Sequence, residues 1–355
     1  EGWFDEYGGP DVGYLSVAID YLGKYYKKTN NKTAFDMLKK AAGFLVHAVH
    51  PDGSVGGVYT SRSTEYLIPS AFEHDAGADV ALLAQVCKQG IEAGVLPSCS
   101  TLDDRYLLYN GYTYVQATLS GQQMPKNIGL LPQGSTFFSE CGWFVRRTSR
   151  YFLVINTKKG GAFYFASLDN KVHDSGLFIS GSPVLSSCFI GSSNEVELFP
   201  KTASKCHRIV IRGTLQASPE ETLSPFKNML LRGTQLTVGR NTSVRNLLKE
   251  TFRDRLIAGK KDAPKSFARD FLKNAFRAKT TPEGALTMKF ERVFILSEDS
   301  VAVEDTVHNP PLDAEFVVGV KQPVQTVPSS RFFVPSDLES HAVISKSAVI
   351  HRKLL

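Results

Sequence analysis

The chain has 355 residues, of which 42% are apolar and 21% charged, and it carries a net charge of +6. This size and composition support one large or two ordinary domains with hydrophobic cores, and they exclude a chain that is disordered as a whole. No apolar run approaches the roughly 18 to 20 residues that cross a bilayer, so we expect no membrane span. The given sequence shows no basic-then-apolar signal segment, which leaves a cytoplasmic or a periplasmic location open.

The first third of the chain has the periodicity of helices. Apolar residues recur at three-and-four spacing over 14–25, with Tyr14, Tyr21 and Tyr25 on the apolar face, and again over 35–49. The same pattern predicts a third helix over 75–93, closed by Gly94, and a fourth over 102–120. Each of these helices is expected to bury its apolar face, and together they form a helical domain over residues 1–121.

The pattern changes after a stretch rich in Gly, Pro and Gln at 121–134, which we interpret as a linker. Beyond it, short runs of β-branched and aromatic residues bounded by turn residues predict strands. These runs are 143–147, 151–155, 161–166, 208–212, 293–296, 301–303 and 316–320. We therefore expect an α+β protein in which an antiparallel sheet domain covers residues 135–355, with a helical insertion at about 243–277.

The positive charge is concentrated in that insertion. Residues 240–279 contain twelve Lys or Arg and four Asp or Glu, a local charge of +8 that leaves −2 for the rest of the chain. A basic stripe attracts polyanions, although a solvated pair of charged helices has the same composition. We expect no nucleic-acid partner, because the segment lacks a recognition module or a platform of stacked aromatic residues.

The sequence contains no recognisable motif for binding a metal or a cofactor. The five cysteines are widely scattered and include no CxxC pair, which argues against a structural zinc and a disulfide framework. Neither a dinucleotide fingerprint nor a phosphate-binding loop of the Walker type occurs. We therefore expect no metal and no cofactor.

A glycine-rich connection at 50–74 concentrates reactive side chains between two helical patterns. It holds Arg62, Glu65, Tyr66 and His74, and loops on a rigid scaffold often carry binding and catalytic residues. This connection is the first candidate for a functional site.

Several motifs resemble the heparinase II/III-like proteins of bacterial polysaccharide gene clusters. They are the segments 2–14, 50–54, 59–66, 150–152, 158–161 and 174–176. The resemblance implies a toroid of paired helices followed by an antiparallel β-sandwich. We expect the toroid to be partial, because only four or five helices fit before Gly121. It also implies a polysaccharide lyase that cleaves an acidic, uronate-containing chain by β-elimination.

β-Elimination needs a group that neutralises the uronate carboxylate, a base that removes the C5 proton and an acid that protonates the leaving oxygen. Within the resemblance we assign Arg62 to the carboxylate, because its planar fork matches that group. Tyr66 is assigned as base or acid, and His74 as its partner base. Glu65 is expected to orient Arg62 or to bind sugar hydroxyls.

Four further residues are expected to contact substrate. Ser63 stands where active relatives often have a neutralising Asn, and Asn110 is a candidate replacement for that amide. Tyr112 is a candidate for stacking on a sugar face. The resemblance implies that His173 enters the cleft from the sheet domain.

Other interpretations of the same residues remain open. Arg62 and Glu65 also suit a structural ion pair, Tyr66 a packed aromatic, and His74 a helix cap. A glycan-binding or exopolysaccharide assembly factor without catalysis is the main alternative to the lyase. A hydrolase would instead need two facing carboxylates, for which Glu65 with Glu73 or Asp75 are the local candidates.

Overall fold

The computed structural model describes residues 1–74, 76–102, 104–120, 131–179, 185–217, 288–310, 314–319, 343–345 and 347–355. By its contacts the chain divides into two compact units. The first comprises Glu1–Ser180, Leu185–Gln216 and Thr287–Leu355. The second comprises Gly181–Val184 and Ala217–Leu286. The predicted insertion at 243–277 and most of the linker at 121–134 lie outside the described residues.

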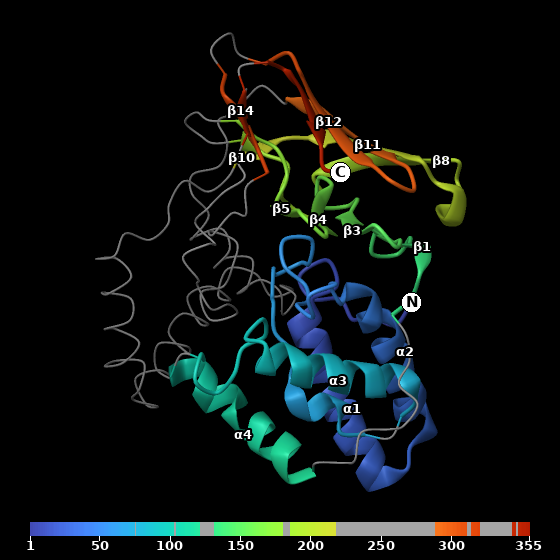
Figure 1. Cartoon of the computed structure of the whole chain (residues 1–355), viewed down its shortest axis with the longest axis vertical. Coiled ribbons are helices and arrows are strands. Elements are labelled where there is room, and N and C mark those ends of the chain that lie inside the picture. Colours follow the sequence, from blue (N-terminus) through green and yellow to red (C-terminus); the bar gives the residue numbers. More distant parts are fainter. Residues whose placement is uncertain are drawn as a thin grey trace, which may run out of the picture. The chain divides into compact units, whose positions relative to one another are not determined.

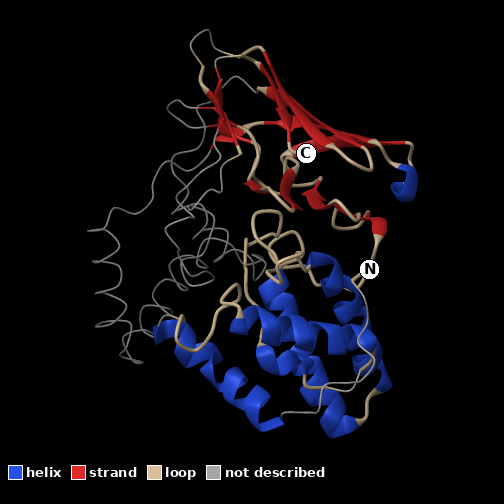
Figure 2. Cartoon of the chain, in the orientation of Figure 1, coloured by secondary structure: helices blue, strands red, loops and turns tan. Residues whose placement is uncertain are grey.

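The described residues form a mixed structure of helices and antiparallel sheets, which confirms the α+β class (Figures 1 and 2). All four helices predicted for residues 1–121 are present. They are α1 (Val12–Thr29), α2 (Lys32–Leu45), α3 (Ala78–Glu92) and α4 (Asp104–Ser120), with short 3₁₀ helices η1 (Val46–Ala48) and η2 (Pro69–Phe72). The helical residues and the first sheet belong to the same compact unit.

The second helix has the expected amphipathic packing. Asn31 caps its first turn by accepting a hydrogen bond from the Ala34 amide, as Asn commonly does at this position. Leu38, Ala41 and Leu45 lie on one side of the helix and are fully buried. The periodic pattern therefore identified the buried face of α2 correctly.

The prediction for α1 was wrong about which face is buried. Tyr14, Tyr21 and Tyr25 point outward, with 37%, 60% and 52% of their surfaces exposed. The buried face carries Gly13, Ser16, Asp20 and Gly23 among its residues. This inversion occurs because the segment 64–74, called the strap below, packs along the small and polar side of α1.

The strap follows α1 in register through side-chain hydrogen bonds. The Thr64 hydroxyl accepts from the Gly13 amide at 2.8 Å, and the Ile68 amide donates to the Ser16 hydroxyl at 3.0 Å. One turn further along, Ser70 donates to Asp20 at 2.8 Å. These bonds satisfy polar groups that would otherwise be costly to bury.

The strands form three antiparallel sheets. The first has the order β1-β2-β3-β4-β5, with β1 (Gly134–Phe138), β2 (Trp143–Arg147), β3 (Tyr151–Asn156), β4 (Ala162–Ser167) and β5 (Lys171–Asp174). The second has the order β10-β7-β6-β13-β14, with β6 (Phe178–Ile179), β7 (Leu185–Ser186), β10 (Gln216–Ala217), β13 (Phe316–Val318) and β14 (Val343–Ser345). The third has the order β15-β12-β11-β9-β8, with β8 (Ser193–Phe199), β9 (Arg208–Thr214), β11 (Lys289–Leu296), β12 (Val301–His308) and β15 (Val349–Lys353). Every run predicted as a strand contributes to one of these sheets.

The first sheet lies between two hydrophobic cores, because its side chains alternate between its faces. Trp143, Val154 and Tyr164 join the core that the helices build. Phe144 and Phe163, on the opposite face, join a second core with residues of β9, β11 and β12. Burial on both faces explains why β3 and β4 are almost continuous apolar runs.

Candidate functional site

The loop 50–66 doubles back on itself at two glycines. Gly56 and Gly57 have φ angles of +70° and +101°, a region that favours glycine. The Gly57 amide donates to the Thr64 carbonyl at 3.0 Å, and a side chain at Gly56 would collide with that same carbonyl. The glycine pair therefore allows the two halves of the loop to lie against each other.

Side chains from the turn between β3 and β4 hold this loop on the first sheet. The buried Lys159 ammonium donates to the carbonyls of Val58 and Thr60, both at 2.8 Å. Asn156 donates to the Tyr59 carbonyl between them at 2.7 Å. Burial lowers the pKa of Lys159 to about 8, and nearby Cys188 and Asp11 oppose that effect. Three consecutive loop carbonyls thus have donors from the sheet.

An aromatic cluster underlies the loop. The His50 ring stacks on Tyr164 with centroids 3.7 Å apart and an interplanar angle of 11°. His50 also bonds through Nδ1 to the Ser54 hydroxyl at 2.8 Å and through Nε2 to the Tyr59 hydroxyl at 3.1 Å. Burial raises the pKa of both tyrosines, so they remain neutral hydrogen-bonding groups at ordinary pH.

Glu65 and His173 both approach Gly57, from segments more than a hundred residues apart. Glu65 Oε1 lies 3.0 Å, and His173 Nδ1 3.6 Å, from the position that a Cβ on Gly57 would occupy. His173 is on β5, the edge strand of the first sheet, opposite Tyr164 in register, and the two ring centroids are 4.8 Å apart. Both residues are partly exposed, but the two atoms that face Gly57, Glu65 Oε1 and His173 Nδ1, are themselves buried. A carboxylate and an imidazole therefore converge on a spot that only a glycine leaves open.

An ion pair borders this spot. Lys171, two residues before His173 on β5, donates to Asp52 of the loop at 2.8 Å. Burial raises the pKa of Asp52, but hydrogen bonds from Lys171 and Ser54 outweigh it and lower the pKa to about 2. The Lys171–Asp52 ion pair thus joins the loop to the edge strand that carries His173.

Arg62 lies at the surface between two tyrosines. Its guanidinium carbon is 4.6 Å from the ring centre of Tyr7 and 5.0 Å from that of Tyr14, and its Nη1 is 3.5 Å from Glu6. Burial lowers the pKa of Arg62, but Tyr14, Tyr7 and Glu6 outweigh burial and raise it. The arginine keeps its charge, held between two aromatic faces and paired with Glu6.

Ser63 and Tyr66 face the helical core instead of solvent. Ser63 is buried and has a φ angle of +55°. Tyr66 is 6% exposed and packs across Gly13, where an added Cβ would lie 2.6 Å from the tyrosine Cζ. The structure thus separates Tyr66 from its neighbour Glu65, which faces Gly57.

His74 lies at the other end of the strap. Its ring fills the space above Gly23, its Nε2 is buried without a hydrogen-bond partner, and burial lowers its pKa. Gly13 and Gly23 are ten residues apart on α1, which is about 15 Å along the helix axis. Tyr66 and His74 are therefore not brought together for proton transfer.

Tyr112 and Asn110 are on α4. The Tyr112 ring lies under the Lys24 ammonium at 5.2 Å, and Lys24 also bonds to Asp20 at 2.6 Å. Burial, followed by the neighbouring Tyr21, raises the pKa of Tyr112. Asn110 is partly exposed, and its carbonyl accepts from the Thr113 hydroxyl. Asp20 and Lys24 also influence the pKa of His74, so Tyr112 and His74 share one neighbourhood, distinct from that of Glu65 and His173.

Sequence reasoning gave no role to three residues that shape the site. Lys159 and Asn156 hold the loop, and Tyr164 contacts both histidines. The only signal was the run 158–161, which entered as part of the resemblance. For a hydrolase, Glu65 and Glu73 were the candidate pair of facing carboxylates, and this pairing gains no geometric support. The other candidate partner, Asp75, lies outside the described residues.

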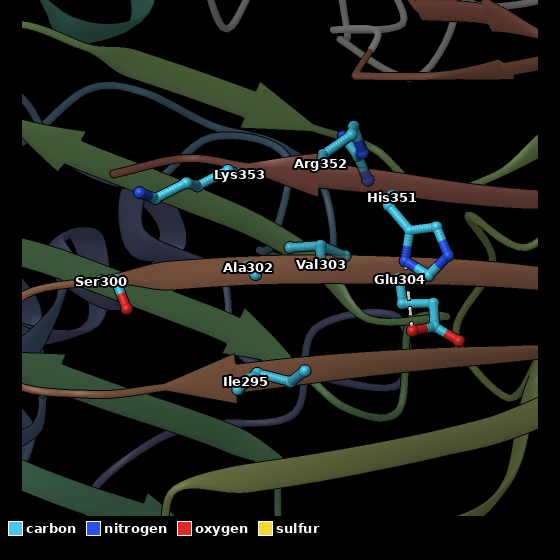
Figure 3. Close-up of a pocket in the computed structure, with 8 residues that line it drawn as sticks. All are labelled: Ile295, Ser300, Ala302, Val303, Glu304, His351, Arg352 and Lys353. Atoms are coloured by element: carbon cyan, nitrogen blue, oxygen red, sulfur yellow. Dashed lines mark ion pairs between the residues drawn. The ribbon is translucent and has the colours of Figure 1, made fainter.

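A shallow cavity of about 330 Å³ lies elsewhere, on β11, β12 and β15 (Figure 3). Glu304 and His351 form an ion pair at 3.2 Å in it, and Ser300 and Lys353 also line it. None of the residues predicted for the site line this cavity.

All five cysteines are free. Across the described ranges, no cluster of three or more His, Cys, Asp and Glu could hold a metal ion. In the same part of the chain, no helix has both the length and the apolarity to cross a membrane. Comparisons with known proteins found no family model that matches the chain and no curated protein similar to it.

Proposed function

We propose that this protein is a polysaccharide lyase that cleaves an acidic, uronate-containing polysaccharide by β-elimination at Glu65 and His173. The observation that carries the proposal is the convergence of these two side chains at Gly57. Both residues can transfer or orient protons, and both are partly exposed beside a fixed loop. Nothing in this assignment requires a metal ion or a cofactor.

In this proposal His173 removes the C5 proton. The electron pair forms the C4–C5 double bond, the C4–O bond breaks, and the leaving oxygen takes a proton from the imidazolium. Glu65, whose carboxylate approaches the same spot beside Gly57, stabilises the charged form of the imidazole through its negative charge. Arg62 binds the uronate carboxylate and so makes the C5 proton more acidic.

The distances along the loop are compatible with one substrate chain. Arg62 and Glu65 are three residues apart, so their Cα atoms are separated by at most about 11 Å. One oligosaccharide could therefore contact both. This proposal moves proton transfer from Tyr66 and His74, which pack against separate parts of α1, to His173 on the edge strand.

We also propose that the helical part belongs to an α/α toroid and that the stacked sheets form a β-sandwich. The support is the antiparallel sheet order and the core shared by the first and third sheets. A site at the junction of a helical layer and a sheet is consistent with that architecture.

The test is a screen of uronate polymers, including alginate, polygalacturonate and glycosaminoglycans, for the absorbance of unsaturated uronate. Wild type should produce the chromophore from at least one polymer. Glu65→Gln and His173→Gln should each lower the rate by about 10² to 10⁴. His207→Gln, at an exposed histidine on the sheet side, is the matched control and should keep wild-type activity. A wild-type protein that never forms the chromophore refutes the lyase.

A second candidate is a glycan-binding or exopolysaccharide assembly factor without catalysis. One observation favours it: Tyr66 and His74, two of the residues first assigned to catalysis, lie about 15 Å apart along α1. This candidate predicts that the protein retains an acidic polysaccharide unchanged. The same screen, combined with a binding measurement, distinguishes the two.

A further inference from the structure

The outward face of α1 is aromatic. Tyr14, Ala18, Tyr21 and Tyr25 follow one another at helical spacing, and the three tyrosines are 37%, 60% and 52% exposed. A helix stripe that faces water is normally polar. Large exposed apolar patches on soluble proteins usually mark an interaction site.

Two tyrosines outside α1 extend the aromatic stripe. Tyr7, 56% exposed, is linked to Tyr14 through the Arg62 guanidinium that lies over both rings. Tyr112 of α4, 46% exposed, adjoins Tyr21. We call Tyr7, Tyr14, Tyr21, Tyr25 and Tyr112 the tyrosine row.

Cations lie against this row. Arg62 contacts Tyr7 and Tyr14, and Lys24 lies 5.2 Å above Tyr112. Tyrosine rings offer an apolar face for stacking on sugar rings and a hydroxyl for hydrogen bonding, while the cations complement carboxylates.

The spacing of the row also fits a chain of sugars. Tyr14 and Tyr21 are seven residues apart on one face of α1, which corresponds to about 10 Å along the axis. This is close to the length of two pyranose residues. Successive rings could therefore contact alternate sugars of an extended polymer.

We propose that the tyrosine row is a binding surface for an extended acidic polysaccharide, additional to the Glu65 and His173 site. The identity of the ligand rests on the proposed function. A row of this kind holds a long chain by several weak contacts whose effects multiply, so affinity should depend on chain length. It needs no proton transfer, so it can exist whether or not the protein is a lyase.

The test compares polymer binding and turnover in wild type and in Tyr21→Ala/Tyr25→Ala. Both side chains are more than half exposed, so the variant should unfold at the same urea concentration as wild type. Each substitution should weaken binding to alginate or polygalacturonate about tenfold. Binding of a disaccharide of the same polymer should not change, and the KM for polymer should rise while kcat stays constant. Phe199→Ala, which removes an exposed ring beneath Arg208, is the matched control.

The outcomes separate this proposal from the lyase. Wild type that binds a uronate polymer through the row, without forming the chromophore, supports the row and refutes the lyase. Equal polymer affinity of the double variant and wild type overturns the row, whatever the activity. If wild type binds no polymer but self-associates, and the double variant does not self-associate, the row is a contact between protein copies. That result would also overturn the proposal.

Discussion

Replacement of Asp174 by asparagine should lower the free energy of unfolding by about 3 to 5 kcal/mol, because it leaves a buried arginine without its counter-charge. Asp174 follows His173 on β5 and is fully buried. Its carboxylate oxygens form ion pairs with Arg292 Nη1 at 2.9 Å and with Arg352 Nη1 at 2.6 Å. Asp305 completes the network, binding the same arginines at 2.5 and 2.8 Å. Two positive and two negative charges balance, so the asparagine variant buries a net positive charge.

The hydrogen bonds of Asp174 point to the same magnitude. Its two oxygens also accept from the amides of Gly176 at 2.7 Å and Gly319 at 3.1 Å. An asparagine keeps only one accepting oxygen, so its amide nitrogen would face two donors. An unsatisfied buried group alone costs about 1 to 3 kcal/mol.

The effect should depend on pH in a defined direction. Burial raises the pKa of Asp174, but Arg292 and Arg352 outweigh burial and lower the pKa below its ordinary value. The stabilisation is therefore fully present above the unfolded pKa of about 3.9 and is lost as the pH falls through the lower folded pKa. The difference between wild type and Asp174→Asn should shrink in that acidic window.

Urea denaturation at pH 7 measures this prediction, with Arg150→Met as the control. Arg150 pairs with Asp299 at 3.3 Å, but the two side chains are 65% and 75% exposed. Loss of such a surface pair should cost less than about 1 kcal/mol. A cost below about 1 kcal/mol for Asp174→Asn as well would refute the account of the buried network.

Three further substitutions probe the loop and the strap. Lys159→Met removes an ammonium whose pKa is lowered to about 8. The free energy of unfolding of wild type, measured by urea titration, should therefore rise by up to about 3 kcal/mol relative to the variant between pH 8 and 10.5. A difference that stays constant over this range would contradict this. Gly57→Ala places a Cβ 3.0 Å from Glu65 at a φ of +101°, and should cost about 1 to 3 kcal/mol in thermal unfolding, whereas an unchanged midpoint would argue against this loop conformation. Gly23→Ala collides with the His74 ring and should destabilise by a similar amount; adding His74→Ala should recover part of the loss, and strict additivity would show that the two residues do not touch.

The sequence predicted the elements well but not always their faces. Runs such as 143–147 and 151–155 are buried on both faces of the first sheet, so their composition identified them as strands. For α1, periodicity singled out Tyr14, Tyr21 and Tyr25 as the core face. The strap, some fifty residues away in sequence, occupies the opposite side, and a local pattern holds no information about that contact.

The site shows the same limit. Glu65 and His173 were both identified as candidates, one from its loop and one from the family resemblance. Their convergence depends on the packing of the loop on the first sheet through Lys159 and Asn156, which spacing in the sequence cannot reveal. Tyr66 and His74 are neighbours in the sequence motif, yet the strap extends along α1 and separates them.

The most direct test of the central claim is a double-mutant cycle of Glu65→Gln and His173→Gln, measured as kcat/KM for formation of unsaturated product from the best uronate polymer. If the two side chains act as one unit, the double variant should be about as slow as the slower single variant. The account would be contradicted if the fold-losses in kcat/KM of the two single variants multiplied in the double variant. Full activity of His173→Gln would contradict it as well.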